Sequence, residues 1–203
     1  MNKRRSFIVG IKSTKLSSKE IFFLKRYKPW GVILFSRNIK NINQAFKLTS
    51  SIKKIFNDKK YPILIDQEGG RVNRLENIIS FKNLTSEFFG KKYIENYMEF
   101  KSLYKLFIDK TSYLLKLIGA NINTTPVLDL RVKGTSKIIG NRSFAKDPKI
   151  VSMIGDHCIK YFHENKIGTV IKHIPGHGLA KVDSHKSTPV INKNLNYLIK
   201  NDF

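Results

Sequence analysis

The sequence is poor in cysteine and in acidic residues. Cys158 is its only cysteine, so no intramolecular disulfide is possible, and we expect a cytoplasmic protein in a reducing compartment. No apolar run approaches the roughly 18 residues that a membrane-spanning helix needs. The sequence also lacks the apolar stretch of a signal peptide, a Pro/Gly/Ser-rich linker and any short repeat, so we expect one domain over residues 1–203.

Acidic side chains are outnumbered, because 38 Lys and Arg stand against 15 Asp and Glu and give a formal net charge of +23. Such a charge suits a nucleic-acid-binding protein, since lysine and arginine neutralise phosphates. The basic residues are spread along the whole chain, however, and no RNP-like, zinc-finger or helix-turn-helix pattern is present. We therefore expect a solvated basic surface with neither a nucleic-acid nor a membrane partner, and nucleic-acid binding stays as a third hypothesis.

Apolar runs typical of buried strands alternate with segments of helical periodicity. The expected strands are residues 7–11, 31–35, 61–65, 120–123 with 127–130, and 169–173. The expected helices are residues 17–27, 41–56, 92–118 and 147–165. Ser17 with Glu20 matches a capping box, and Asp147 before Pro148 matches a helix start.

This alternation predicts an α/β fold with a parallel sheet, either doubly wound or part of a (β/α)8 TIM-type barrel. Polar residues follow the ends of several expected strands, among them Arg37, Asp66, Asp129 and Lys172. Such convergence is typical of a barrel active site. A dinucleotide-binding sheet concentrates glycines after its first strand, and residues 10–12 do not match that pattern. We therefore predict a barrel of which about the first five βα units are present.

Asp66 and Glu68 open the segment DQEGGR directly after the third expected strand. In extended geometry they share a face, so both carboxylates can accept hydrogen bonds from sugar hydroxyls, and Arg71 or Arg74 can donate to them. The two glycines that follow permit a sharp turn and close approach of a ligand. The alternative is that a carboxylate pairs with a neighbouring arginine and braces the barrel mouth.

The segment KHIPGHGLAKVDSH, residues 172–185, concentrates polar groups at the fifth strand's end. It contains Lys172, Asp183 and the histidines His173, His177 and His185. Asp183 and His185 can pair, so that the carboxylate orients the imidazole for proton transfer. A metal site built from the histidines and Asp183 is the rival interpretation. Their spacing matches no standard zinc pattern, so we expect neither a metal nor a cofactor.

The loop GNRSF, residues 140–144, carries Arg142, which can act as a guanidinium clamp or pair with Asp129 or Asp147. His157 and His163 lie on an expected helix away from the strand ends, so we interpret both as structural. Three polar residues near the fourth expected strand are expected to hold loops rather than to contact a ligand: Asn121, Asn123 and Asp129.

Taken together, these motifs resemble glycoside hydrolase family 3, and within it the cytoplasmic β-N-acetylhexosaminidases of peptidoglycan recycling. The matching strings occur in the family's order and cover nearly the whole chain: GVILFSRN at 31–38, IDQEGGRVNRL at 65–75, PVLDL at 126–130, GNRSF at 140–144 and KHIPGHG…DSH at 172–185. The last of these is quite specific to the family.

The resemblance implies hydrolysis of terminal non-reducing β-linked N-acetylglucosamine from muropeptides or related glycosides. It also implies retention of configuration through a covalent glycosyl intermediate on an aspartate. It assigns the general acid/base to His185 and the partner of that histidine to Asp183, a departure from the two-carboxylate arrangement usual in glycosidases. The residues that it places against the N-acetylglucosamine are Asp66, Arg74, Arg142, Lys172 and His173.

The family's nucleophilic aspartate follows a later strand, and Asp202 lacks that sequence context, so we assign no nucleophile within residues 1–203. We expect a truncated N-terminal barrel domain that is inactive alone and that a C-terminal polypeptide would complete. The alternative is a non-catalytic remnant of the same fold that binds N-acetylglucosamine.

Overall fold

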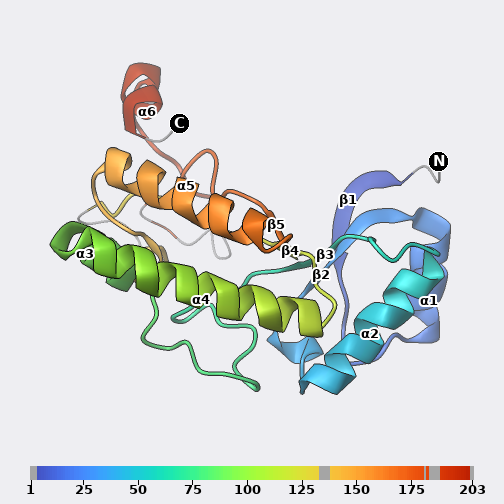
Figure 1. Cartoon of the computed structure of the whole chain (residues 1–203). Coiled ribbons are helices and arrows are strands. Elements are labelled where there is room, and N and C mark those ends of the chain that lie inside the picture. The colour runs from blue at the N-terminus through green and yellow to red at the C-terminus, as the bar shows by residue number, and fades with distance from the viewer. Residues whose placement is uncertain (1–3, 133–137, 181, 183–187, 202–203) are drawn as a thin grey trace.

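Five parallel strands form one sheet in the computed structural model, which describes residues 4–132, 138–180, 182 and 188–201 (Figure 1). The strands are β1 (Arg5–Gly10), β2 (Pro29–Leu34), β3 (Ile63–Ile65), β4 (Ile122–Asn123) and β5 (Gly168–Thr169). Each pairs with the next, so the spatial order equals the chain order. A doubly wound sheet reverses its order at a switch point, and the described strands show no reversal. This order is that of a barrel wall.

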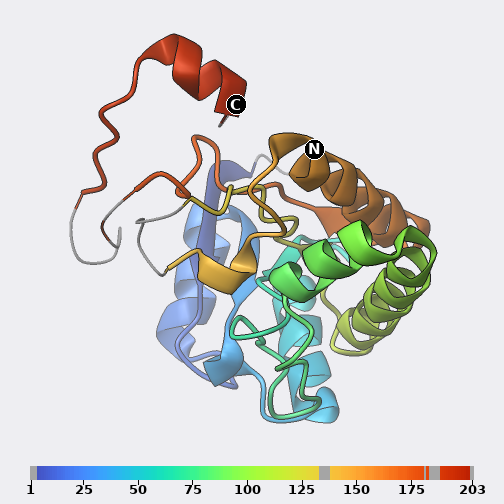
Figure 2. The ribbon, with the colours of Figure 1, turned by 90° about the vertical axis from the view of Figure 1, so that its left-hand side faces the viewer.

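Helices connect the successive strands, and one more helix, α6, follows the last described strand. They are α1 (Ser18–Tyr27), α2 (Ile42–Ile55), α3 (Ser86–Glu95), α4 (Tyr97–Leu117), α5 (Pro148–Glu164) and α6 (Leu195–Asn201), with short 3-10 turns η1 (Ser36–Asn38) and η2 (Gly140–Arg142). α1 and α2 lie beside one end of the sheet, α3 to α5 lie beside the other end, and α6 projects away from both groups (Figures 1 and 2). Within the described residues, no helix is long and apolar enough to cross a membrane.

The helix starts follow from local side-chain chemistry, as the sequence predicted. The Ser17 side chain accepts a hydrogen bond from the Glu20 N–H, and the Glu20 carboxylate accepts one from the Ser17 N–H at 2.8 Å, which completes the capping box of α1. Asp147 caps α5, with Pro148 at its first position. These caps satisfy N–H groups that a helix start otherwise leaves unpaired.

Three predicted elements were wrong in extent. The fourth strand, expected over residues 120–123 with 127–130, is only Ile122–Asn123, and Val127 forms an isolated bridge. The helix expected over residues 92–118 is two helices, because Asn96 ends α3 and its side chain accepts a hydrogen bond from the Glu99 N–H to start α4. The fifth strand, expected over 169–173, spans only two residues. Its pairing with the neighbouring segment resumes beyond Pro126, where Val127 and Lys172 form an isolated parallel bridge.

The core lies between the sheet and its helices. Val32 and Leu34 of β2, Ile65 of β3 and Ile52 of α2 are all inaccessible to solvent. Burying each such aliphatic side chain contributes about 1.5–3 kcal/mol. This packing fixes the direction of the strands and therefore the edge of the sheet at which their carboxyl ends meet.

Candidate active site

Side chains from three neighbouring strands meet at the carboxyl edge of the sheet. Asp66 follows β3 directly, Thr124 follows β4, and Lys172 lies just beyond β5. Lys172 Nζ is 2.9 Å from Asp66 Oδ1, and the Thr124 hydroxyl donates to the same carboxylate oxygen. Because parallel strands end at a common edge, residues distant in the sequence form one polar cluster there.

Glu68 is buried next to this cluster and contacts two cations, Lys172 and Arg142. Its side chain is only 3% exposed, and its Oε1 is 2.6 Å from Lys172 Nζ. Arg142 binds the same carboxylate in a bidentate contact, with Nε 2.8 Å from Oε2 and the terminal nitrogen Nη2 2.9 Å from Oε1. Such a paired contact fixes the plane of the guanidinium. The partner of Arg142 is thus Glu68, rather than the Asp129 or Asp147 that the sequence had suggested.

The two carboxylates remain ionised although both are largely buried. Burial on its own would raise the pKa of Glu68, but the hydrogen bond from Arg142 and the charge of Lys172 hold that pKa below its ordinary value. Burial would likewise raise the pKa of Asp66, and the charge and hydrogen bond of Lys172 outweigh it. Arg74 adds to this effect, with a terminal nitrogen 3.7 Å from Asp66 Oδ2. Asp66 therefore remains an acceptor for hydroxyl groups, surrounded by donors.

The His173 side chain is held by Asp129, a residue outside the charged cluster. Its Nδ1 is 2.6 Å from Oδ2 of Asp129, whose side chain has no exposed surface, while the His173 side chain is 35% exposed. The sequence expectation that Asp129 holds a loop is consistent with this contact. Asn123 does the same for the neighbouring loop, since its amide accepts from the Gln67 N–H and donates to the Gln67 carbonyl, both at 2.9 Å.

Glycines permit the loop after β3. Gly69 has φ +92 and Gly70 has φ +56, a region that side chains disfavour, and a Cβ on Gly69 would collide with the Leu84 carbonyl oxygen. Gln67 then fixes the far end of this loop, because its side-chain oxygen accepts from the Arg74 N–H at 2.9 Å. The loop thereby directs Arg74 toward Asp66.

The structure joins four of the five predicted ligand contacts in one charged cluster: Asp66, Arg74, Arg142 and Lys172. The fifth, His173, follows Lys172 in the chain and contacts Asp129. The predicted acid/base pair, Asp183 and His185, lies outside the described residues. Arg71, predicted together with Arg74 as a donor to the carboxylates, donates to the carbonyls of Ile138 and Ile139. Thr124 was missed, although it follows β4 as directly as Asp66 follows β3, and that shared position was the available signal.

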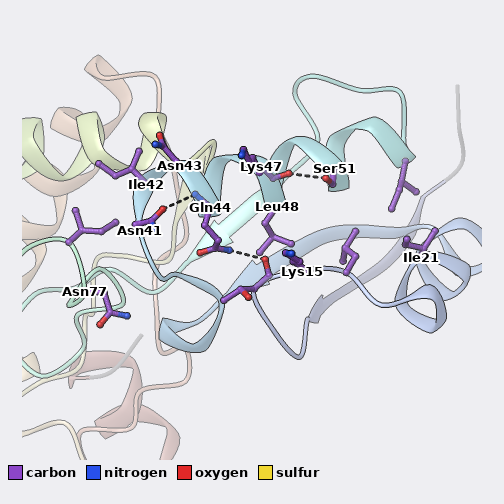
Figure 3. Close-up of a pocket in the computed structure, with 14 residues that line it drawn as sticks. Lys15, Ile21, Asn41, Ile42, Asn43, Gln44, Lys47, Leu48, Ser51 and Asn77 are labelled. Carbon is purple, nitrogen blue, oxygen red and sulfur yellow. Dashed lines mark hydrogen bonds between the residues drawn. The ribbon is translucent and has the colours of Figure 1, made fainter.

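A large groove lies elsewhere, between α1 and α2 (Figure 3). It has a volume of about 1050 Å³, and Lys15, Asn41, Lys47 and Leu48 are among its lining residues. Within the part of the chain that the structure describes, no residue of the charged cluster lines this groove. We place the candidate site at the cluster, because convergent charged groups of opposite sign are found there.

Comparison with known proteins finds relatives of similar sequence and solved structures of similar fold. A β-hexosaminidase of Bordetella avium is 32% identical over 201 residues, covering 96% of this chain and 55% of that protein. The crystal structure of native NagZ from Neisseria gonorrhoeae matches with a TM-score of 0.87 and 28% identity, over 98% of this chain and 57% of that one. A second structure of that protein, in complex with N-trifluoroacetyl-D-glucosamine, matches with a TM-score of 0.85 and 29% identity over 97% and 57%.

These matches confirm the barrel-type α/β fold that the sequence predicted. The chain spans about half the length of the relatives that it matches. The model of the glycosyl hydrolase family 3 N terminal domain matches residues 8–203. The chain therefore belongs to glycosyl hydrolase family 3.

Proposed function

We propose that this chain forms the sugar-binding and proton-transfer part of a cytoplasmic β-N-acetylhexosaminidase. The reaction is removal of terminal non-reducing β-linked N-acetylglucosamine from muropeptides or related glycosides. The observation that carries the proposal is the cluster at the strand ends, in which Asp66 and Glu68 are joined by Lys172. Family membership and the neighbour that binds an N-acylated glucosamine support it.

The cluster suits a pyranose with several hydroxyl groups. Asp66 offers carboxylate oxygens as acceptors, while Lys172 and Arg142 offer donors, so adjacent hydroxyls can each donate and accept. These three side chains are between 16% and 19% exposed, so none of them is fully closed off from solvent. Glu68, at 3% exposed, contributes by fixing the two cations.

Proton transfer is assigned to His185, with Asp183 as its partner. A neutral imidazole near its ordinary pKa can accept a proton, and the imidazolium can return one, so one residue can serve both steps of a retaining mechanism. The first step would protonate the leaving oxygen, and the second would take a proton from the attacking water.

The covalent step needs an aspartate nucleophile, which we assign to a strand beyond residues 1–203. Among the described strands, β1 and β5 are the two edges of the sheet, and further strands would pair there. Apolar side chains near those edges are exposed, Ile8 at 44%, Val170 at 39% and Ile171 at 45%. Exposed apolar edges favour pairing with more chain, so we propose that a C-terminal polypeptide completes the barrel.

The deciding experiment is to read the coding sequence after Phe203, express the protein that it encodes and assay it with an aryl N-acetylglucosaminide. We expect cleavage, and His185→Ala should slow both steps by about 10²–10⁴-fold, the usual contribution of general acid/base catalysis. His163→Ala, an exposed histidine of α5, is the matched control. A longer protein without an aspartate at a later strand end, or without activity, would contradict the proposal.

A second candidate is a non-catalytic module that binds N-acetylglucosamine. It is favoured by the fact that four of the proposed sugar contacts are joined in one cluster within the described residues. Titration calorimetry with N-acetylglucosamine tests it on the 203-residue chain. Binding without turnover in any longer form of the protein would favour this candidate over the enzyme.

A further inference from the structure

Asp129 is a buried carboxylate that contacts one short segment, residues 173–177. It lies on the stretch after β4 that runs beside Lys172, where the Leu128 N–H donates to the Lys172 carbonyl at 2.6 Å. Its side chain is fully shielded from solvent. A buried charge is costly unless hydrogen-bonded groups compensate it, so the partners of Asp129 define its role.

Three donors of residues 173–177 point at this carboxylate. Oδ2 accepts from the His173 N–H at 3.3 Å and lies 2.6 Å from His173 Nδ1, while Oδ1 accepts from the His177 N–H. Burial alone would raise the pKa of Asp129, but the His173 side chain and the two N–H groups hold that pKa below its ordinary value. The carboxylate is therefore charged and can only accept.

This arrangement determines which nitrogen of His173 carries the proton. An ionised carboxylate has no proton to donate, so Nδ1 must be the protonated nitrogen of a neutral ring. The second nitrogen, Nε2, is then an acceptor, and the 35% exposure of the side chain leaves part of the ring open to a ligand. A histidine ligand is commonly oriented in this way by a carboxylate behind it.

We propose that Asp129 is a positioning residue, which fixes the rotation and the Nδ1–H tautomer of His173 so that Nε2 accepts a hydroxyl of the bound sugar. The inference rests on the proposed function, because it names the atom that His173 offers to N-acetylglucosamine. Asp129 itself does not touch the substrate. Its contact with the His177 N–H also holds the beginning of the loop that follows.

The proposal predicts a spectroscopic signature in the unmodified 203-residue chain. Long-range ¹H–¹⁵N correlation spectra distinguish the two neutral tautomers of histidine, and His173→Gln identifies the signal. We expect the Nδ1–H form for His173 in the wild-type chain, before any variant of Asp129 is made. The opposite tautomer, or a mixture of the two, would overturn the proposal, and this result does not depend on whether a variant folds.

The second measurement is N-acetylglucosamine affinity by titration calorimetry. Asp129→Asn should release the tautomer and weaken binding by at least about tenfold, since a hydrogen bond to a charged group contributes about 1.5–3 kcal/mol. Asp156→Asn, at an exposed position of α5, is the matched control and should change neither readout. Unchanged affinity in a folded Asp129→Asn chain would overturn the positioning role.

The two proposals fail in different ways. A wild-type chain with the expected tautomer but no affinity for N-acetylglucosamine would contradict the proposed function, and with it the sugar-facing role of Nε2. A chain that binds the sugar normally while His173 carries its proton on Nε2 would overturn the role of Asp129 and leave the proposed function intact.

Discussion

Glu68 is the carboxylate on which the charged cluster depends, and Glu68→Gln tests that dependence. The substitution keeps the size of the side chain but removes the charge between Lys172, at 2.6 Å, and Arg142, at 2.8 Å and 2.9 Å. With an effective dielectric constant of about 20, the gross attraction at such distances is about 6 kcal/mol per pair, much of which offsets desolvation. The net loss is therefore much smaller than the sum of the attractions.

Breaking a buried ion pair by removing one partner costs about 3–5 kcal/mol. Glutamine keeps one oxygen that can accept from Arg142, so we expect a loss in the free energy of unfolding near the lower end, about 3 kcal/mol. Urea unfolding followed by circular dichroism measures it, and equal slopes in the two proteins would make the midpoints comparable. Glu164→Gln is the matched control, because Glu164 is 44% exposed and its Lys105 contact is 3.6 Å long.

The pH dependence gives a second readout of the same substitution. Because the folded pKa of Glu68 lies below its unfolded value, its stabilisation is present above about pH 4.3 and is lost as the pH falls through the folded pKa. Wild type should therefore lose more stability on acidification than Glu68→Gln. A variant as stable as wild type, with the same acid dependence, would refute the assignment of Glu68 as the group that neutralises Lys172 and Arg142.

Three further predictions concern other parts of the chain. Asn96→Ala should lower the free energy of unfolding by about 1 kcal/mol, because it removes the side-chain oxygen that caps α4 by accepting from the Glu99 N–H. An unchanged urea midpoint would contradict the break between α3 and α4. Gly178→Ala should weaken N-acetylglucosamine binding in titration calorimetry, because its Cβ would collide with the Leu130 carbonyl oxygen; unaltered affinity would show that this close approach does not position the site. Duplex DNA binding, followed by fluorescence anisotropy, should be weak with a shallow salt dependence, whereas a steep one would favour the nucleic-acid hypothesis.

Local chemistry made several elements predictable. The apolar run of residues 31–35 and the capping box at Ser17 and Glu20 each depend on neighbours in the sequence, and the structure has β2 and α1 there. The boundary at Asn96 was missed because the apolar stripe continues across this residue. An asparagine caps a helix start only where its own backbone is not helical, and the sequence does not show that conformation. The short β5 was missed because strand length depends on the partner strand.

The sequence by itself determined the family motifs, the order of strands and helices, and the residues that the resemblance assigns to a sugar. It did so because each of these is written in residue type and spacing. Only the tertiary structure decided which charges meet, since Glu68 and Arg142, or Asp129 and His173, are far apart in the chain and are joined by the parallel packing of β3, β4 and β5. The pairing of buried charges is a property of that packing, because the free energy of a buried ion depends on every group around it.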